Sequence, residues 1–188
     1  AMTANTTGAS NTALGSSALT ASNGSSNVAV GDVSLYANTT GSNNTAVGTY
    51  SLYSNTTASN NTAVGYDALG DCTIGHSNVA VGHNAMNALT DADENTAVGK
   101  DSLGALTTGN YNTAIGFESL ASATTSTQLV AVGRHALYSN STGTQNTALG
   151  YSALYANTTG DSNTASGYFA LGGNTTGGNN TAYGRDSL

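Results

Sequence analysis

One short phrase recurs at a fixed interval along this chain, and the fold has to accommodate that repetition. The phrase reads approximately N-T-A-V-G-x-x-[AS]-L-x-x-N-T-T-G-x-x. After a first step of 16 residues, every step between the phrase glycines is 17 residues, at Gly15, Gly31, Gly48, Gly65, Gly82, Gly99, Gly116, Gly133, Gly150, Gly167 and Gly184. A fixed period is typical of repeat proteins, in which each unit packs only on its neighbours. The sequence therefore predicts an array of eleven stacked units.

Each unit is too short for a helical crossover. Residues 45–47 (T-A-V) would point their side chains to alternate faces of a strand, and the glycine that follows favours a positive φ or a close backbone approach. We expect residues 50–53 to form a second short strand and residues 55–57 to form a turn. The predicted fold class is all-β, a parallel β-roll or β-solenoid of about eleven 17-residue coils.

Stacked coils place each residue against its own copy in the next coil. The Asn that opens the phrase predicts a ladder of amide hydrogen bonds, which Leu129 interrupts in one coil. The Ala between Thr and Val predicts closely packed backbones, and the later Leu predicts a bulky apolar column. Because such a core is thin and strand edges are exposed, we expect an oligomer.

Two copies of the phrase carry a family resemblance. Residues 78–82 (N-V-A-V-G) and 112–116 (N-T-A-I-G) resemble the head repeats of YadA-like trimeric autotransporter adhesins and related repeats of phage or phage-like tail fibres. The resemblance covers essentially the whole chain, although this unit is longer than the usual adhesin head repeat. It implies a left-handed β-roll, a homotrimer, and an extracellular location at a cell surface or on a virion or phage-like tail.

The chain divides into a short start and one long array. We expect residues 1–10 to form an initial turn that includes a vector remnant at Ala1 and Met2, and residues 11–188 to form a single solenoid cut from a longer fibre. No apolar run approaches the roughly 20 residues that a membrane helix needs, so no membrane contact is predicted for this segment. The net charge of −7, with only Lys100, Arg134 and Arg185 as cations, argues against nucleic acid as a partner.

No catalytic set, metal site or cofactor site is predicted. His76, His83 and His135 lie in different repeats and are interpreted as solvated surface residues, and the single Cys72 has no evident partner. The acidic run at residues 91–94 is better explained as a turn than as a calcium loop, because it lacks the glycine spacing of calcium loops and occurs in one repeat only.

The residue directly after the phrase glycine differs from repeat to repeat, whereas most other positions repeat the same residue types. It holds aromatic residues and cations, and the candidate ligand-binding residues chosen from it are Tyr66, Phe117, Arg134, Tyr151 and Tyr168. A second tyrosine group lies four residues further on, at Tyr36, Tyr53, Tyr138 and Tyr155. Two interpretations stay open at this point: a solvated rim that shields the core, and a stripe that faces a ligand.

The sequence as a whole favours a structural and adhesive role rather than an enzyme. The expected function is a segment of a trimeric extracellular fibre that presents or contributes to binding of a host or cell surface, with a glycan or protein receptor as partner. One alternative is an ice-binding solenoid, because a Thr opens the strand in most repeats, although we expect these Thr side chains to point inward or toward a partner chain. A second alternative is a polysaccharide-degrading tailspike, which requires paired carboxylates.

Overall fold

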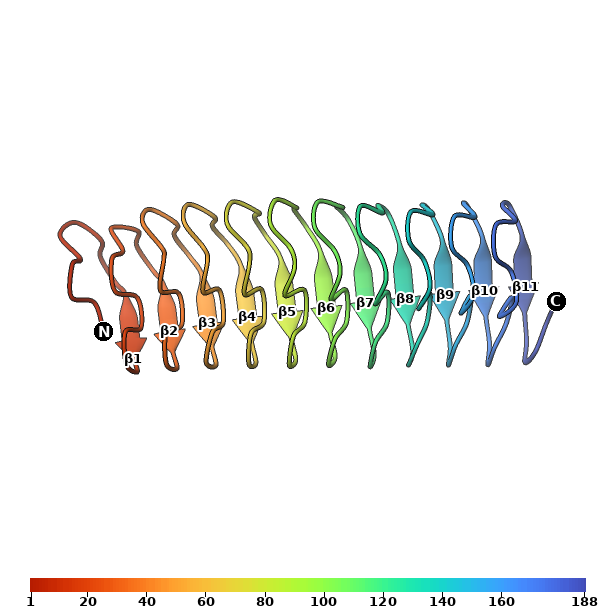
Figure 1. Cartoon of the computed structure of the whole chain (residues 1–188), viewed down its shortest axis with the longest axis horizontal. Helices are drawn as coiled ribbons and strands as arrows, with labels where there is room; N and C mark the ends of the chain where they lie inside the picture. Colours follow the sequence, from red (N-terminus) through yellow and green to blue (C-terminus); the bar gives the residue numbers. More distant parts are fainter.

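The coils of this protein stack into a rod with the two termini at opposite ends (Figure 1). The structure is a computed structural model that describes residues 1–188. Each coil contributes one strand of three residues, and the strands are β1 (Thr12–Leu14), β2 (Val28–Val30), β3 (Thr45–Val47), β4 (Thr62–Val64), β5 (Val79–Val81), β6 (Thr96–Val98), β7 (Thr113–Ile115), β8 (Val130–Val132), β9 (Thr147–Leu149), β10 (Thr164–Ser166) and β11 (Thr181–Tyr183). They form one sheet in sequential order with parallel neighbours, which confirms the predicted solenoid.

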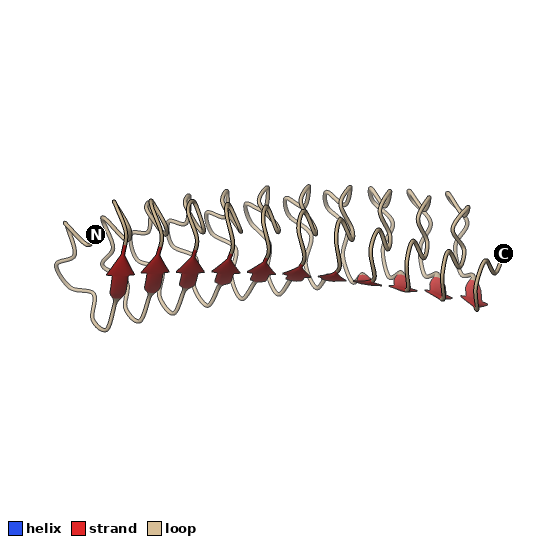
Figure 2. Cartoon of the chain, turned by 90° about the horizontal axis from the view of Figure 1, so that it is seen from below, coloured by secondary structure: helices blue, strands red, loops and turns tan.

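The register of the sheet follows the period of the sequence. Between β3 and β4, Thr45 pairs with Thr62, Ala46 with Ala63 and Val47 with Val64, so each letter of the phrase lies on its own copy. Figure 2 shows the strands in one row along the rod, with long turns completing each coil. The fold contains no helix that could cross a membrane.

The phrase glycine is required because two backbones meet at this point. Gly99 has a φ of 136°, and a Cβ added to it would lie 2.4 Å from the carbonyl oxygen of Gly116 in the next coil. The same positive φ recurs at every phrase glycine, from Gly15 to Gly184. Any other residue would have both a strained backbone and a clash with the following coil, so the recurrence of glycine follows from the stacking.

The predicted second strand at residues 50–53 is wrong, and these residues form a turn. Tyr50 and Leu52 have φ values of 62° and 49°, whereas strand residues need a negative φ. The turn still bonds to both neighbouring coils, because the Tyr50 N–H donates to the Asp32 carbonyl at 3.3 Å and the Leu52 N–H donates to the Ala68 carbonyl at 3.0 Å. Of 111 backbone hydrogen bonds in the chain, only 20 join two strand residues, so most of the backbone bonding involves the turns and the ends of the strands.

The interior is a narrow apolar core of 33 buried residues. Its two main columns are the strand Ala, such as Ala97, and the turn Leu, such as Leu103, and both of these side chains are fully buried. The predicted Ala and Leu columns are therefore confirmed. At the end of the rod nothing stacks on Leu188, which is 87% exposed.

The opening Asn forms the predicted ladder, and its bonds are more varied than amide to amide. The Asn61 backbone N–H donates to the side-chain oxygen of Asn44 at 3.0 Å, and the Asn61 amide nitrogen donates to the Gly75 carbonyl at 2.8 Å. Direct amide-to-amide bonds also occur, as from Asn112 to Asn95 at 3.0 Å. Leu129 interrupts the ladder and is fully buried, while its backbone N–H still donates to Asn112.

The outer face of the sheet carries two columns of strand side chains. In β3, Ala46 is buried, whereas Thr45 is half-buried and Val47 is exposed on the opposite face. The Thr side chains do not point inward, because the buried Ala of each strand fixes the Thr and Val on its two sides to the outer face. The other alternative, that they face a partner chain, stays a prediction.

Substituting one phrase glycine tests whether backbone contact sets the stacking. We expect Gly99→Ala to lower the melting temperature strongly or to prevent folding, since left-handed strain alone costs about 1–3 kcal/mol and the clash with Gly116 adds to it. Thermal unfolding followed by circular dichroism measures the effect. Gly104→Ala is the matched control, because its added Cβ would approach nothing closer than 3.4 Å. Equal melting temperatures for the two variants would contradict this explanation of the glycine.

Candidate functional site

Four of the five candidate ligand residues form one continuous stack along the rod. Arg134 lies between two rings, with its guanidinium carbon 5.4 Å from the Phe117 ring centre and 5.6 Å from the Tyr151 ring centre. Tyr151 and Tyr168 then stack almost parallel, with ring centres 5.2 Å apart and an angle of 6° between their planes. The coil repeat places consecutive residues of this column at stacking distance, and the structure thus joins residues separated by up to three repeats.

Cations cover both ends of this stack. The Lys100 Nζ atom lies 5.4 Å from the Phe117 ring centre, and the Arg185 guanidinium carbon lies 5.2 Å from the Tyr168 ring centre. Lys100 is also paired with Asp101, and that hydrogen bond raises the pKa of the Lys100 ammonium group. The stack therefore contains all three of the chain's Lys and Arg residues.

Tyr66 is separate from the stack. Its ring stacks on His83 with ring centres 5.2 Å apart, and Tyr50 on the preceding coil meets it edge to face with ring centres 5.8 Å apart. Tyr66 is 50% exposed. The structure thus places four candidates together and the fifth three coils before Phe117.

The stacking decides which part of each ring a ligand can reach. Both faces of Tyr151 are covered, one by Arg134 and the other by Tyr168, and Phe117 lies between Lys100 and Arg134 in the same way. What these rings present to solvent is an outer edge and, for the tyrosines, a hydroxyl group. A sugar ring therefore finds edges and hydroxyl groups along this column rather than free aromatic faces.

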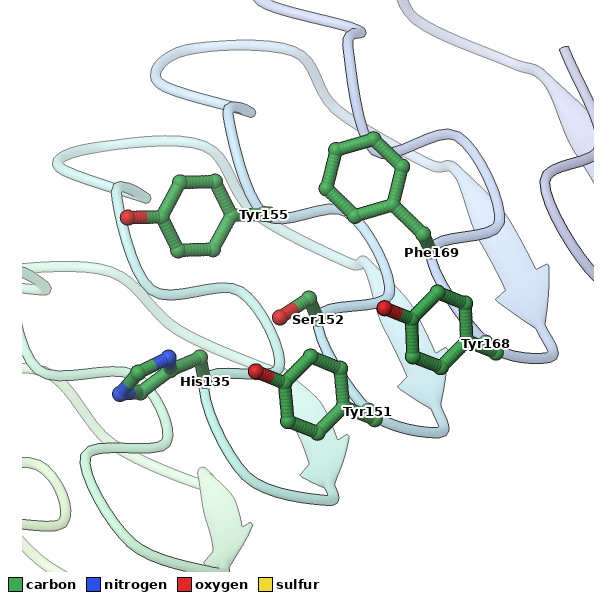
Figure 3. A pocket seen from close by; sticks show the side chains of 6 residues that line it. All are labelled: His135, Tyr151, Ser152, Tyr155, Tyr168 and Phe169. Carbon is green, nitrogen blue, oxygen red and sulfur yellow. The ribbon is translucent and has the colours of Figure 1, made fainter.

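Beside the stack lies the one pocket of the rod, with a volume of about 310 Å³. Figure 3 shows the aromatic side chains around a small central residue. The lining residues are His135, Tyr151, Ser152, Tyr155, Tyr168 and Phe169. Two of the sequence-predicted candidates, Tyr151 and Tyr168, therefore form one wall of it.

The pocket exists because one column of side chains has a gap. His135, Ser152 and Phe169 occupy the second position after the glycine in three successive coils, and the small Ser152 leaves room between the two rings. Further along the coil, Gly172 has no side chain to stack on Tyr155, and the Phe169 ring lies over Gly172 instead. Sequence reasoning missed this site, although writing the repeats in columns shows a Ser between His and Phe.

The interpretation of His135 as a solvated residue is wrong. Its side chain is only 17% exposed and lies 5.6 Å from the Phe117 ring and 5.2 Å from the Tyr138 ring, measured between ring centres. Its Nε2 atom is 3.0 Å from a carboxylate oxygen of Glu118 without the alignment of a hydrogen bond. His76 and His83 are exposed, as predicted.

The second tyrosine group forms two separate pairs. Tyr36 stacks on Tyr53 with ring centres 5.4 Å apart, and Tyr138 stacks on Tyr155 at 5.3 Å. Only the second pair lies near the pocket, where Tyr155 contributes to the lining.

The acidic run and the cysteine have structural roles. A carboxylate oxygen of Asp93 accepts the His76 backbone N–H at 2.6 Å, which confirms the turn interpretation for this residue. Cys72 is fully buried in the position where Asn38 and Asn55 stack, and burial raises the pKa of its thiol to about 12. No group of three or more His, Cys, Asp or Glu side chains is arranged to hold a metal ion.

The remaining close pair of carboxyl groups lies far from the pocket. Burial raises the pKa of Asp67, and the nearby charge of Asp71 raises it further, while an Asn87 hydrogen bond and His83 act in the opposite direction. Neither Asp67 nor Asp71 lines the pocket, and no carboxyl group does.

Comparison of the chain with protein-family models, with curated proteins and with solved structures found no match. The assignment of a function consequently depends on the residues and their geometry.

Proposed function

We propose that this chain is a structural and adhesive segment of an extracellular fibre, in which three copies of a left-handed rod associate side by side. The observation that supports it best is an apolar column along the outer face of the sheet. Val47, Val64, Val81 and Val98 are each 36–37% exposed, and Ile115 extends the column at 41%. A continuous apolar column on the surface favours burial against another chain.

The thinness of the core supports the same proposal. The 33 buried apolar residues of the core are spread over eleven coils and are mostly Ala with a Leu or Met in most coils, so little apolar surface is removed from water within one chain. Association through the valine column adds apolar burial in every coil, and it covers the one face where the strands are regular. The resemblance to adhesin heads and tail fibres specifies three chains rather than two.

The adhesive part of the proposal depends on the stack and the pocket beside it. These side chains lie outside the apolar core, and Tyr151 and Tyr168 are 40% and 48% exposed. Three parallel copies would present three such surfaces, so weak individual contacts with a cell surface add up through multivalency.

An ice-binding solenoid is the second candidate. The Thr column does lie on the outer face in register, as such a function requires, but Val28, Val79 and Val130 interrupt it. The trimer covers the same face, so the two proposals exclude each other. A polysaccharide-degrading tailspike is less well supported, because hydrolysis requires two carboxyl groups around the substrate and the pocket has none.

Light scattering tests the assembly. We expect the purified chain to give about three times the mass of 18.5 kDa, and we expect Val81→Lys/Val98→Lys to give the mass of a monomer, because two charges would enter the interface. Thr40→Lys/Thr57→Lys is the matched control, since it adds the same charge in exposed turns. A native chain that is a monomer at micromolar concentration would contradict the trimer and leave the Thr face free for the ice-binding alternative.

A binding assay on whole cells and a glycan array tests adhesion. We expect the native trimer to bind, and the variant carrying Ser at Tyr66, Phe117, Tyr151 and Tyr168 to lose at least tenfold in binding while still trimeric. Ser is compatible with this position, because Ser16 occupies it in the first repeat. Tyr36→Ser/Tyr53→Ser removes an aromatic pair elsewhere and serves as the control. Equal binding by the quadruple variant would show that the stack is only a rim.

A further inference from the structure

We propose that the pocket over Ser152 binds one pyranose ring of a surface glycan. This inference rests on the adhesive role proposed above, and it adds both a location and a ligand class. It also explains how a chain whose aromatic stack has covered faces can still hold a sugar ring.

The first argument is the shape of the gap. His135 and Phe169 lie two coils apart in the same column, which corresponds to about 10 Å along the rod, and Ser152 fills only the base of the space between them. A volume of about 310 Å³ is at the lower end of the range for small-molecule sites. One six-membered ring with its substituents suits this space, whereas an oligosaccharide would have to extend out of it.

The second argument is the mixture of apolar rings and hydroxyl groups. Sugars present apolar C–H faces bordered by hydroxyl groups, and they need aromatic surface together with hydrogen-bonding partners. In Figure 3 the Tyr168 hydroxyl points toward Ser152 and the Tyr151 hydroxyl points toward the side of His135, while the Phe169 ring closes the far end.

Ser152 itself is the most informative of these groups. As a residue it is only 4% exposed, it lines the pocket, and its hydroxyl makes no hydrogen bond to another group of the chain. By contrast, buried hydroxyl groups such as that of Ser119 donate to a backbone carbonyl of their own coil. The Ser152 hydroxyl is not one of the buried side-chain atoms that lack a partner, which are Asn55 Oδ1 and His135 Nε2, so it is open to the pocket and free to bond a polar group of a ligand.

The third argument is charge, which selects among ligands that favour aromatic pockets. Arg134 Nη1 donates to the Tyr151 hydroxyl at 3.0 Å, and the Arg185 guanidinium lies over Tyr168, so two cations stand beside the tyrosine wall. Two carboxylates occupy the same column as the pocket, because Glu118 lies 3.0 Å from His135 and Asp186 pairs with Arg185 at 3.1 Å. The two cations and two carboxylates balance, which favours a neutral pyranose, and a quaternary ammonium ligand, which binds open aromatic faces, finds the faces of Tyr151 and Tyr168 covered by the arginines and by each other.

The test is saturation-transfer NMR on the native chain with methyl hexopyranosides of gluco, galacto and manno configuration, methyl glucuronide, and benzyltrimethylammonium as the cationic probe. We expect transfer to at least one pyranoside and none to the ammonium probe. Ser152→Phe should reduce the pyranoside affinity at least tenfold, because the new ring fills the gap. Phe169 has the same φ of 51° as Ser152, so a Phe is compatible with this backbone.

Ser17→Phe is the matched control, because Ser17 occupies the equivalent position of the first coil with a φ of 51° and lines no pocket. Phe169→Ser, which removes one wall, should also weaken binding. Transfer to no pyranoside, transfer to the ammonium probe instead, or unchanged binding by Ser152→Phe would each overturn the proposal. Loss of cell binding by the quadruple variant but not by Ser152→Phe would reject the pocket while leaving the adhesive role intact.

Discussion

Contact between backbones at the phrase glycine sets the distance between coils, and the rest of the structure depends on that distance. A Cβ at Gly48, Gly82 or Gly133 would lie between 2.3 and 2.5 Å from the next coil's carbonyl oxygen, so only glycine permits the approach. At this separation the Gly116 N–H donates to the Val98 carbonyl at 2.8 Å, and backbone groups elsewhere in the coil also bond to the neighbouring coils. The Asn ladder, the Leu column and the aromatic stack are consequences of that one spacing.

Because of this spacing, buried positions accept few residue types, whereas surface positions accept many. A buried column accepts only residues that stack on their own copies, as Leu103 and Asn95 do, or that fill the same space, as Leu129 does. The residues just after the glycine lie outside this core, and there the chain places rings and cations that stack equally well at one coil's distance. A rod built in this way can change its surface chemistry coil by coil without changing its fold, which suits the adhesive role that we propose.

The sequence predicts the period, the parallel sheet and the buried columns, because in a stack of equal coils each residue must pack against its own copy in the next coil. It does not predict the turn at residues 50–53, since apolar spacing alone does not distinguish a strand from a turn in which alternate residues, such as Tyr50 and Leu52, have positive φ. The candidate stack follows from the sequence because its members share one position. The pocket does not, because Ser152 matters only through its neighbours His135 and Phe169.

Residue-by-residue amide hydrogen exchange tests most directly whether contacts between coils hold the rod together around its whole circumference. The Leu69 and Leu103 amides lie in turns but donate to the next coil at 3.0 Å, as the Gly99 amide donates to the preceding coil at 2.8 Å. We predict that the turn amides exchange as slowly as those of the glycine column in the middle coils. Rapid exchange of the Leu amides, with protection confined to the strands, would contradict this account.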